Sequence, residues 1–343
     1  MRIVLTANIA PFLQGGADYH INGLRDALQQ FGFETVLIRF PFKFHPVQDI
    51  QHLMNYCAGL ELNQANGISI DRVISLQFPG YGIQHHDHWV WLMHQHRAVY
   101  ELFDPHSSDP KCQQLRETIV PYDNQTLGKA QKVFANSQRV ADRLMQFNQI
   151  KSQALYHPPA YAAYFRCEEA LPYVFCPSRL ETLKRQDLLI KAAQFLRTPV
   201  QIVFAGIGGQ SAYYQQLATD CGVAERVIFL GHITEAEKIA FYAHALAVCF
   251  VPYDEDYGYV TLEAMLSAKP VITVDDAGGP LEFVTQGCNG WVCEPDPQDI
   301  AAAIDEAFTQ PQLSRDRGRT GHALYAELGI SWSTVVEKLT AEV

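Results

Sequence analysis

Apolar and polar residues follow two recurring patterns along the chain. Short, nearly continuous apolar runs are typical of strands buried on both faces of a parallel sheet, and apolar residues at every third or fourth position are typical of amphipathic helices. In the first half the pattern predicts strands over 2–7, 34–39, 72–78, 89–94 and 132–135, and helices over 17–31 and 138–147. Strands that alternate with helices pair in parallel through right-handed crossovers, which predicts an α/β unit.

The alternation pauses at His157-Pro158-Pro159 and then starts again. A residue before proline is excluded from the α region, so this segment predicts a stiff connector, and we divide two domains at residues 160 and 161. Beyond it the predicted strands are 173–177, 200–205, 227–230, 246–251, 270–274 and 291–293. The predicted helices are 185–196, 211–222, 235–244, 259–267, 299–308 and a segment after about 313 that breaks near Gly329. We therefore predict two Rossmann-like domains. Open α/β sheets bind ligands at the carboxyl ends of their strands, so we expect the two domains to face each other across a cleft that holds the ligand.

Composition narrows the function classes. The 343 residues suffice for two domains, and the net charge of −11 argues against nonspecific nucleic-acid binding, which needs a basic surface. The segment Met1–Thr6 predicts a first strand rather than a secretory signal, and no run approaches the roughly 20 apolar residues of a membrane span. The eight cysteines are scattered without metal-binding spacing. We therefore expect a cytoplasmic protein with reduced cysteines.

Two loops after predicted strands carry groups suited to an anion. Gly15-Gly16 follows the first strand, where small residues and a helix start bring backbone N–H groups close to a phosphate; a simple turn is the alternative. Arg179 and Lys184 follow the strand 173–177 and would hold a diphosphate by charge-assisted hydrogen bonds. A solvated charge run that opens a helix is the alternative, and spacing alone favours it.

Two further loops of the second predicted domain would lie at the same edge of its sheet as Arg179 and Lys184. Glu255 lies in an acidic loop and Glu263 in the helix that follows, and carboxylates accept hydrogen bonds from sugar hydroxyls. Gly258 permits close backbone approach at a helix start, where a phosphate is stabilised. Capping of the helix by the acidic loop is the alternative. Gly278-Gly279 places another backbone turn after the strand 270–274.

Together these loops resemble the retaining family 4 glycosyltransferases of GT-B fold, in which seven residues separate two glutamates. The resemblance covers nearly the whole chain and is densest over 173–295. The segments that carry it are Arg179 with Lys184, Glu255 with Glu263, the helix and strand from Glu263 to Ile272, Gly278-Gly279, Asn289-Gly290, Gly15-Gly16 and Asn136-Ser137. Asp256 departs from the pattern at a position that is often glycine, which leaves the transferred sugar open.

The resemblance implies a role for each residue. Arg179 and Lys184 would bind the donor's diphosphate with help from the Gly16 backbone. Glu263 would hold the ribose hydroxyls of the nucleotide, and Glu255 the hydroxyls of the transferred hexose. The remaining donor contacts would come from His232, Ile233, Tyr257, Gly258, Tyr259 and Val260.

The resemblance also implies a histidine that contacts the donor sugar at the end of the strand 89–94. His94 is the first choice and His96 the second, and Arg97 is a weaker candidate for an acceptor or phosphate contact. A buried structural role for at least one of the two histidines is the alternative. A zinc site in the polar loop 84–88 is disfavoured because no cysteine or carboxylate spacing accompanies its histidines, which are His85, His86 and His88.

The implied domain roles are acceptor binding by 1–160, nucleotide-sugar binding by 161–325, and a C-terminal helix at 326–343 that packs back on the first domain. The implied reaction is a front-face, retaining hexose transfer to an acceptor hydroxyl. It requires no metal or other cofactor, because Arg179 and Lys184 neutralise the leaving diphosphate, which takes the acceptor's proton.

The acceptor is left open as a glycan, a lipid or glycolipid, or a small molecule, and we expect loops around 41–52 and 105–122 to shape its site. Peripheral membrane contact is compatible with such acceptors, although no strongly basic amphipathic helix supports it. The alternative functions are a nucleotide-sugar epimerase, a phosphorylase and a noncatalytic nucleotide-sugar binding protein. An NAD-dependent dehydrogenase is disfavoured, since the glycines at 206–209 do not form GxGxxG after a first strand.

Overall fold

The chain forms two compact units in a computed structural model that describes residues 1–12, 15–106 and 109–342. Unit 1 comprises Met1–His157 and Ser331–Val343, and unit 2 comprises Pro158–Ile330. The chain therefore passes between the units twice, at His157-Pro158 and at Ile330-Ser331. Within the described residues, no helix has both the length and the apolar character needed to span a bilayer.

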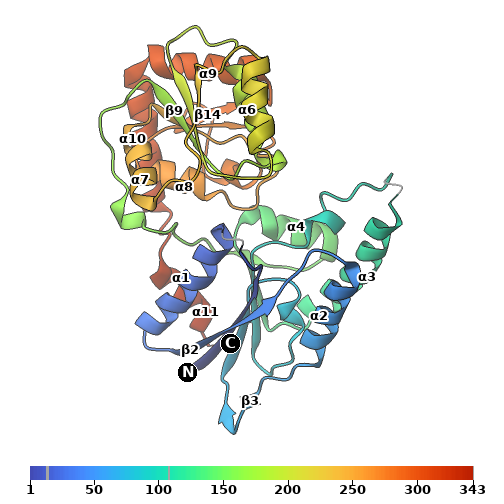
Figure 1. Ribbon diagram of the computed structural model, residues 1–343. Helices are drawn as coiled ribbons and strands as arrows, with labels where there is room; N and C mark the ends of the chain where they lie inside the picture. The colour runs from blue at the N-terminus through green and yellow to red at the C-terminus, as the bar shows by residue number, and fades with distance from the viewer. Residues whose placement is uncertain (13–14, 107–108, 343) are drawn as a thin grey trace. The chain divides into compact units, whose positions relative to one another are not determined.

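Unit 1 is built on a six-stranded parallel sheet in the order β2-β1-β5-β6-β7-β8. The strands are β1 (Arg2–Ile9), β2 (Glu34–Pro41), β5 (Arg72–Ser75), β6 (His88–Leu92), β7 (Lys132–Ala135) and β8 (Gln153–Ala154). One face is covered by α1 (Gly16–Gln30) and α11 (Trp332–Thr340), as Figure 1 shows. The other is covered by α2 (Val47–Gly59), α3 (Pro110–Leu127) and α4 (Gln138–Asn148). A small hairpin, β3 (Gln64–Ala65) with β4 (Ile68–Ser69), lies outside this sheet.

Unit 2 repeats this architecture with the strand order β11-β10-β9-β12-β13-β14, again all parallel. Its strands are β9 (Tyr173–Pro177), β10 (Gln201–Ala205), β11 (Val227–Phe229), β12 (Ala247–Cys249), β13 (Val271–Val274) and β14 (Gly290–Cys293). Helices α5 (Gln186–Ala192), α6 (Ser211–Asp220) and α9 (Pro297–Thr309) share one core. Helices α7 (Glu235–His244) and α8 (Tyr259–Leu266) share the other, and α10 (Pro311–Glu327) packs on α8 and α9.

The C-terminal helix α11 packs on α1 within unit 1. Gly23 lies so close to the Trp332 ring that a Cβ there would be 2.2 Å from it, so only glycine fits. The buried residues Val335 and Leu339 join the same core as the first strand. An Nη of Arg72 donates to the backbone carbonyl of Leu339 at 2.8 Å, which fixes the end of this helix against β5.

The segments 41–52 and 105–122 were predicted to be loops, and this is wrong because each is partly helical. Helix α2 begins at Val47 and continues beyond residue 52, and α3 occupies most of 105–122; Ser107 and Ser108 lie outside the described residues. Helix α2 buries Ile50, Met54 and Cys57, which lie on one face. Helix α3 contains Pro121 in its interior, a residue that normally interrupts helices and so hid the pattern.

Several predicted boundaries also shift, and two of these shifts concern segments that carry candidate site residues. The strand predicted over 89–94 ends at Leu92, so His94 lies in the loop beyond it. The helix predicted over 185–196 is shorter, because Arg185 has a φ of 50°, which is not helical. A single 3₁₀ turn at Thr182–Lys184 precedes this residue, and α5 begins after it.

Candidate functional site

The predicted chemistry of unit 2 gathers where β9, β10, β12 and β13 end. The backbone N–H of Tyr253 donates to the carbonyl of Leu183 at 2.8 Å, which joins the loop after β9 to the loop after β12. The N–H of Glu255 donates to the carbonyl of Ala277 at 2.8 Å, which joins the loop after β12 to the loop after β13. Loops separated widely in sequence are therefore assembled at one edge of the sheet, as expected for the carboxyl ends of parallel strands.

The loop that carries Arg179 rests on a glycine turn. A Cβ on Gly206 would be 2.2 Å from the carbonyl oxygen of Ser178, and one on Gly208 would be 2.3 Å from that of Leu180. The buried amide of Gln186 donates from Nε2 to Ser178 Oγ and to the carbonyl of Arg179, both at 2.8 Å. The backbone is thus fixed from two sides, while the Arg179 side chain is exposed.

Lys184 and Glu255 are brought together. The Nζ of Lys184 forms an ion pair with Oε2 of Glu255, and the two side chains are 18% and 20% exposed. The ammonium also lies 5.4 Å from the ring centroid of Phe250. A half-buried cation and a carboxylate thus stand side by side at the sheet edge, where a ligand with both anionic and hydroxyl groups would find a partner for each.

Sequence reasoning missed the residue next to Lys184. The guanidinium of Arg185 donates to the carbonyls of Val251 at 3.0 Å and Pro252 at 2.7 Å, and to the two carboxylate oxygens of Asp276 at 2.9 and 2.5 Å. It therefore clamps the loops after β9, β12 and β13 together. A positive φ at an arginine is the only local sign of this role, and it is invisible in the sequence.

The Glu255 loop also rests on a glycine pair. A Cβ on Gly278 would lie 2.6 Å from the carbonyl oxygen of Glu255, and one on Gly279 would lie 2.8 Å from that of Asp256. The N–H of Gly279 donates to the carbonyl of Glu255 at 2.8 Å. Gly258, with a φ of 81°, then starts helix α8. Tyr257 and Val260 beside it are buried, and Tyr259 is half-buried.

Glu263 lies in α8 and is 6% exposed. Its Oε1 accepts a hydrogen bond from Lys238 Nζ at 2.9 Å, and its Oε2 accepts one from the Tyr242 hydroxyl at 2.7 Å. Burial raises the pKa of Glu263, although Lys238 and Tyr242 act in the opposite direction. Neither partner was predicted; both come from α7, and their spacing of four residues on one helix face was the available signal.

The loop between β11 and α7 carries the predicted base contacts. His232 is exposed, and Ile233 is partly buried against the core under α7 and α8. Thr234 caps α7 through a reciprocal pair of hydrogen bonds with Glu237. The capped helix start fixes where this loop ends.

Unit 1 holds the other predicted residues. Gly16 is the exposed first residue of α1, and the Asp18 carboxylate accepts from the Gly15 N–H at 3.2 Å. His94 is exposed, and its Nδ1 donates to the carbonyl of Gln95 at 2.7 Å.

His96, the second choice for the sugar contact, and Arg97, the weaker candidate for an acceptor or phosphate contact, are both more enclosed than His94. His96 packs edge-on against Phe78, and burial lowers its pKa. The Nε of Arg97 donates to Glu101 at 2.5 Å, and Glu101 also pairs with Arg143. These contacts give Arg97 a structural role in unit 1.

The histidines at 85–88 lie in two different environments. Among the described residues, no group of three or more His, Cys, Asp or Glu side chains is arranged to hold a metal ion. His88 was predicted to lie in a polar loop, and this is wrong. It is a buried residue of β6 that forms a hydrogen bond with Ser75 at 2.8 Å. His85 and His86 stack on each other with ring centroids 4.3 Å apart.

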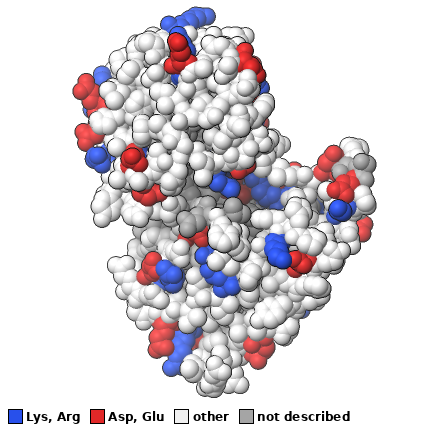
Figure 2. Space-filling view, viewed as in Figure 1, with Lys and Arg blue, Asp and Glu red and all other residues white. Residues whose placement is uncertain are grey.

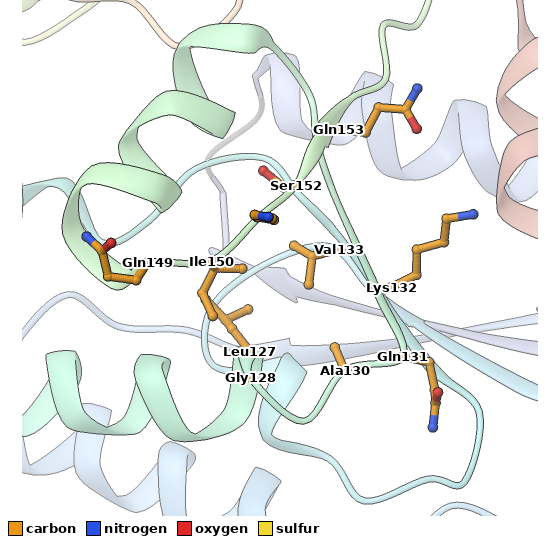
Figure 3. Close-up of a pocket in the computed structure, with 11 residues that line it drawn as sticks. Leu127, Gly128, Ala130, Gln131, Lys132, Val133, Gln149, Ile150, Ser152 and Gln153 are labelled. Atoms are coloured by element: carbon orange, nitrogen blue, oxygen red, sulfur yellow. The ribbon is translucent and has the colours of Figure 1, made fainter.

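A hollow of about 440 Å³ lies elsewhere on unit 1, where α3, β7, α4 and β8 meet (Figure 3). It is lined by Lys132 and Val133 at the start of β7 and by Gln149 to Gln153 after α4. This is the amino end of the sheet, opposite the edge where open α/β sheets bind ligands. None of the predicted site residues lines it.

Surface charge does not point to a nucleic acid. Figure 2 shows lysine and arginine interspersed with aspartate and glutamate over the face in view. With a net charge of −11, the chain lacks the excess of basic residues that binding to a phosphate backbone needs.

Comparison with known proteins agrees with this geometry. Residues 166–323 match the family described as glycosyl transferases group 1. The chain is 34% identical over 113 residues to an alpha-1,3/1,6-mannosyltransferase of Mus musculus. The aligned residues make up 33% of this chain and 27% of that protein. It is 26% identical over 300 residues to a D-inositol 3-phosphate glycosyltransferase of Mycobacteroides abscessus, which covers 78% of this chain and 67% of that protein. The match to the mannosyltransferase thus spans less than a third of that relative's length.

Solved structures match over almost the whole chain. A sucrose-phosphate synthase from Thermosynechococcus elongatus superimposes with a TM-score of 0.80 at 16% identity, covering 98% of this chain and 97% of that one. Anabaena HepE in complex with UDP and glucose superimposes with a TM-score of 0.73 at 19% identity, covering 99% and 98%.

The protein therefore contains a group 1 glycosyltransferase domain, and the predicted family resemblance is confirmed at that level. The predicted fold class, an α/β chain with two Rossmann-like domains of the GT-B kind, is confirmed as well.

Proposed function

We propose that this protein is a retaining glycosyltransferase that moves a hexose from a nucleoside diphosphate sugar to an acceptor hydroxyl. The observation that carries the proposal is the half-buried pair of Lys184 and Glu255 beside the exposed Arg179. It offers cations for a diphosphate and a carboxylate for sugar hydroxyls at one sheet edge. The group 1 family match to residues 166–323 includes all three residues.

In the proposed site, Arg179 and Lys184 bind the diphosphate. Glu255 exchanges part of its contact with Lys184 for the hydroxyls of the hexose, and Glu263 accepts from the ribose. The start of α8 after Gly258 faces its N–H groups toward the phosphates. His232 and Ile233 lie beside the base. Gly16 and His94 of unit 1, with His96 and Arg97 as weaker candidates, stay predictions.

The proposed chemistry needs no side-chain nucleophile. The bond between the anomeric carbon and the diphosphate oxygen breaks, and its electron pair stays on the diphosphate. Arg179 and Lys184 stabilise the negative charge that develops there, an effect for which one lost donor typically lowers the rate by about 100-fold or more. The acceptor oxygen bonds to the anomeric carbon from the same face, and its proton passes to the leaving phosphate oxygen. No metal is required for this step.

The donor is proposed to carry uridine or guanosine, and the acceptor to be a glycan, a lipid or a small molecule. HepE was solved with UDP and glucose, and a relative from Mycolicibacterium smegmatis is named as a GDP-mannose-dependent mannosyltransferase. UDP-glucose and GDP-mannose are therefore the first donors to test.

A thermal-shift panel of UDP-, GDP- and ADP-sugars tests the proposal. A ligand that binds the folded state at about 100 times its Kd stabilises it by about 2.7 kcal/mol. We expect one nucleotide sugar to raise the Tm of the wild type and to lose that effect in Lys184→Ala. Lys191→Ala is the matched control, because Lys191 pairs with Asp187 four residues earlier within α5 and contacts none of the predicted site residues in that pair. Folded wild type that responds to no nucleotide sugar would refute the proposal.

A further inference from the structure

Lys238 forms an ion-pair network between α7 and α8. Its Nζ lies 2.9 Å from Oε1 of Glu263 and 2.8 Å from Oε2 of Glu235. The Lys238 and Glu263 side chains are 15% and 8% exposed, so both charges are largely removed from water. A buried carboxylate is unstable as an anion unless it is paired, and here the pairing partner is a lysine on the preceding helix.

The electrostatics of the pair are reciprocal. Burial opposes the charge on Lys238, but the carboxylates of Glu263 and Glu235 outweigh it and raise the pKa of the lysine. Lys238 in turn lowers the pKa of Glu263 against the larger effect of burial. The ammonium is therefore the main group that favours the ionised form of Glu263.

The two partners of Glu263 use only part of its capacity. Lys238 occupies one lone-pair direction on Oε1, and Tyr242 occupies one on Oε2. An ionised carboxylate has about four such directions, so about two are left for outside donors. The two contacts also fix the orientation of the carboxylate, because they hold both of its oxygens.

We propose that Lys238 is a positioning residue for recognition of the donor's ribose. It holds Glu263 ionised and in one orientation, so that the carboxylate can accept hydrogen bonds from the ribose 2′- and 3′-hydroxyls. It also ties α8 to α7, the helix that begins directly after the base-binding loop at His232 and Ile233. The inference rests on the proposed function, since it requires a nucleotide in this site.

Binding of ribose and deoxyribose nucleotides tests this inference. Kd is measured for UDP and 2′-deoxy-UDP, and for GDP and 2′-deoxy-GDP, with wild type, Lys238→Met and Glu263→Gln. We expect the wild type to prefer one ribonucleotide over its deoxy form by about 10-fold or more, as for loss of a hydrogen bond to a charged group. In Lys238→Met the ratio should fall to within about 3-fold, and it should fall similarly in Glu263→Gln.

The double variant Lys238→Met/Glu263→Gln, together with the wild type and the two single variants, forms a double-mutant cycle. If Lys238 acts through Glu263, the double variant should discriminate no less than Glu263→Gln alone, because the effects are not additive. It also leaves no buried carboxylate at position 263, and Glu235, which loses the same lysine, is 34% exposed, so the double variant carries the test if Lys238→Met does not fold. Lys191→Met, which removes a partly buried ion pair with Asp187 in α5, should keep the wild-type ratio.

The outcomes separate this inference from the proposed function. Wild type that binds neither UDP nor GDP nor any nucleotide sugar overturns the proposed function and the inference with it. Wild type that binds a nucleotide without preferring the ribose form overturns the inference alone. A folded Lys238→Met, or a double variant, that keeps the full wild-type preference also overturns it.

Discussion

Arg185 provides the sharpest test of how the loop with Lys184 is held. Its φ of 50° lies in the left-handed region, which is less stable than the right-handed one for an L-residue by about 1–2 kcal/mol. Its guanidinium binds the Asp276 carboxylate and two backbone carbonyls. Arg185→Ala removes these bonds and keeps the unfavourable backbone, whereas Arg185→Gly removes both.

The magnitudes follow from burial and geometry. A hydrogen bond to a charged group contributes about 1.5–3 kcal/mol, and the 17% and 34% exposure of Arg185 and Asp276 places each of these bonds below that range. We take about 3 kcal/mol for the whole clamp. Arg185→Ala should therefore lower the free energy of unfolding by about 3 kcal/mol, and Arg185→Gly by about 1–2 kcal/mol, since glycine carries no left-handed penalty.

Urea denaturation of both variants measures this difference. Arg166→Ala, which removes an exposed pair with Glu168, is the control and should change stability by less than about 1 kcal/mol. The folded Arg185→Gly variant should also bind the nucleotide sugar at least about 10-fold more weakly, because Lys184 and Glu255 lose their fixed loops. An alanine variant as stable as the glycine variant would refute the backbone argument. Unchanged ligand affinity in both would refute the positioning role.

Two further predictions address the glycine pair and acid stability. Gly278→Ala should weaken donor binding and lower stability by more than the roughly 1–2 kcal/mol of a left-handed alanine, because its Cβ would lie 2.6 Å from the Glu255 carbonyl. Gly287→Ala, with a φ of 76° and open space around it, should show the conformational penalty alone in the same urea and binding assays, and equal effects would contradict the packing argument. For pH, burial lowers the pKa of His157 to about 3, so the unfolded state binds the proton more readily and stability falls as pH drops below about 6.5. Between pH 7 and pH 5 this histidine should account for a loss of about 2 kcal/mol, which His157→Phe should remove; an unchanged pH dependence in the variant would contradict it.

Much of the fold could be predicted from the sequence because the strands are short apolar runs. The predicted strand at 173–177 and the predicted helix at 235–244 coincide with β9 and α7. Helices α2 and α3 could not be predicted in the same way. Their polar faces are broad and α3 contains Pro121, so tertiary packing against the sheet, rather than local pattern, decides that they are helical.

The residues of the candidate site also fall into two groups, those that could be predicted from the sequence and those that could not. The loops with Arg179, Lys184 and Glu255 could be located, because parallel strands place their carboxyl ends at one edge. The partners that fix them could not. Arg185 reaches a carboxylate 91 residues away, and Lys238 reaches one 25 residues away. Such contacts depend on which helices the fold places together, and the four-residue spacing of Lys238 and Tyr242 shows only that these two side chains share a helix face, not which residue they contact.

Two of the site loops are fixed in the same way, by close packing of their backbone on a pair of glycines. The Arg179 loop lies on Gly206 and Gly208, and the loop from Glu255 to Asp256 lies on Gly278 and Gly279. At each of these glycines a Cβ would come within 2.2–2.8 Å of a neighbouring backbone atom, so backbone packs directly on backbone. The loops are therefore held without using the side chains of Arg179 or Glu255. Under the proposed function, stability and ligand recognition therefore depend on different parts of the same segments: the glycines and the Arg185 clamp determine where the loops lie, and the side chains that the loops carry bind the donor.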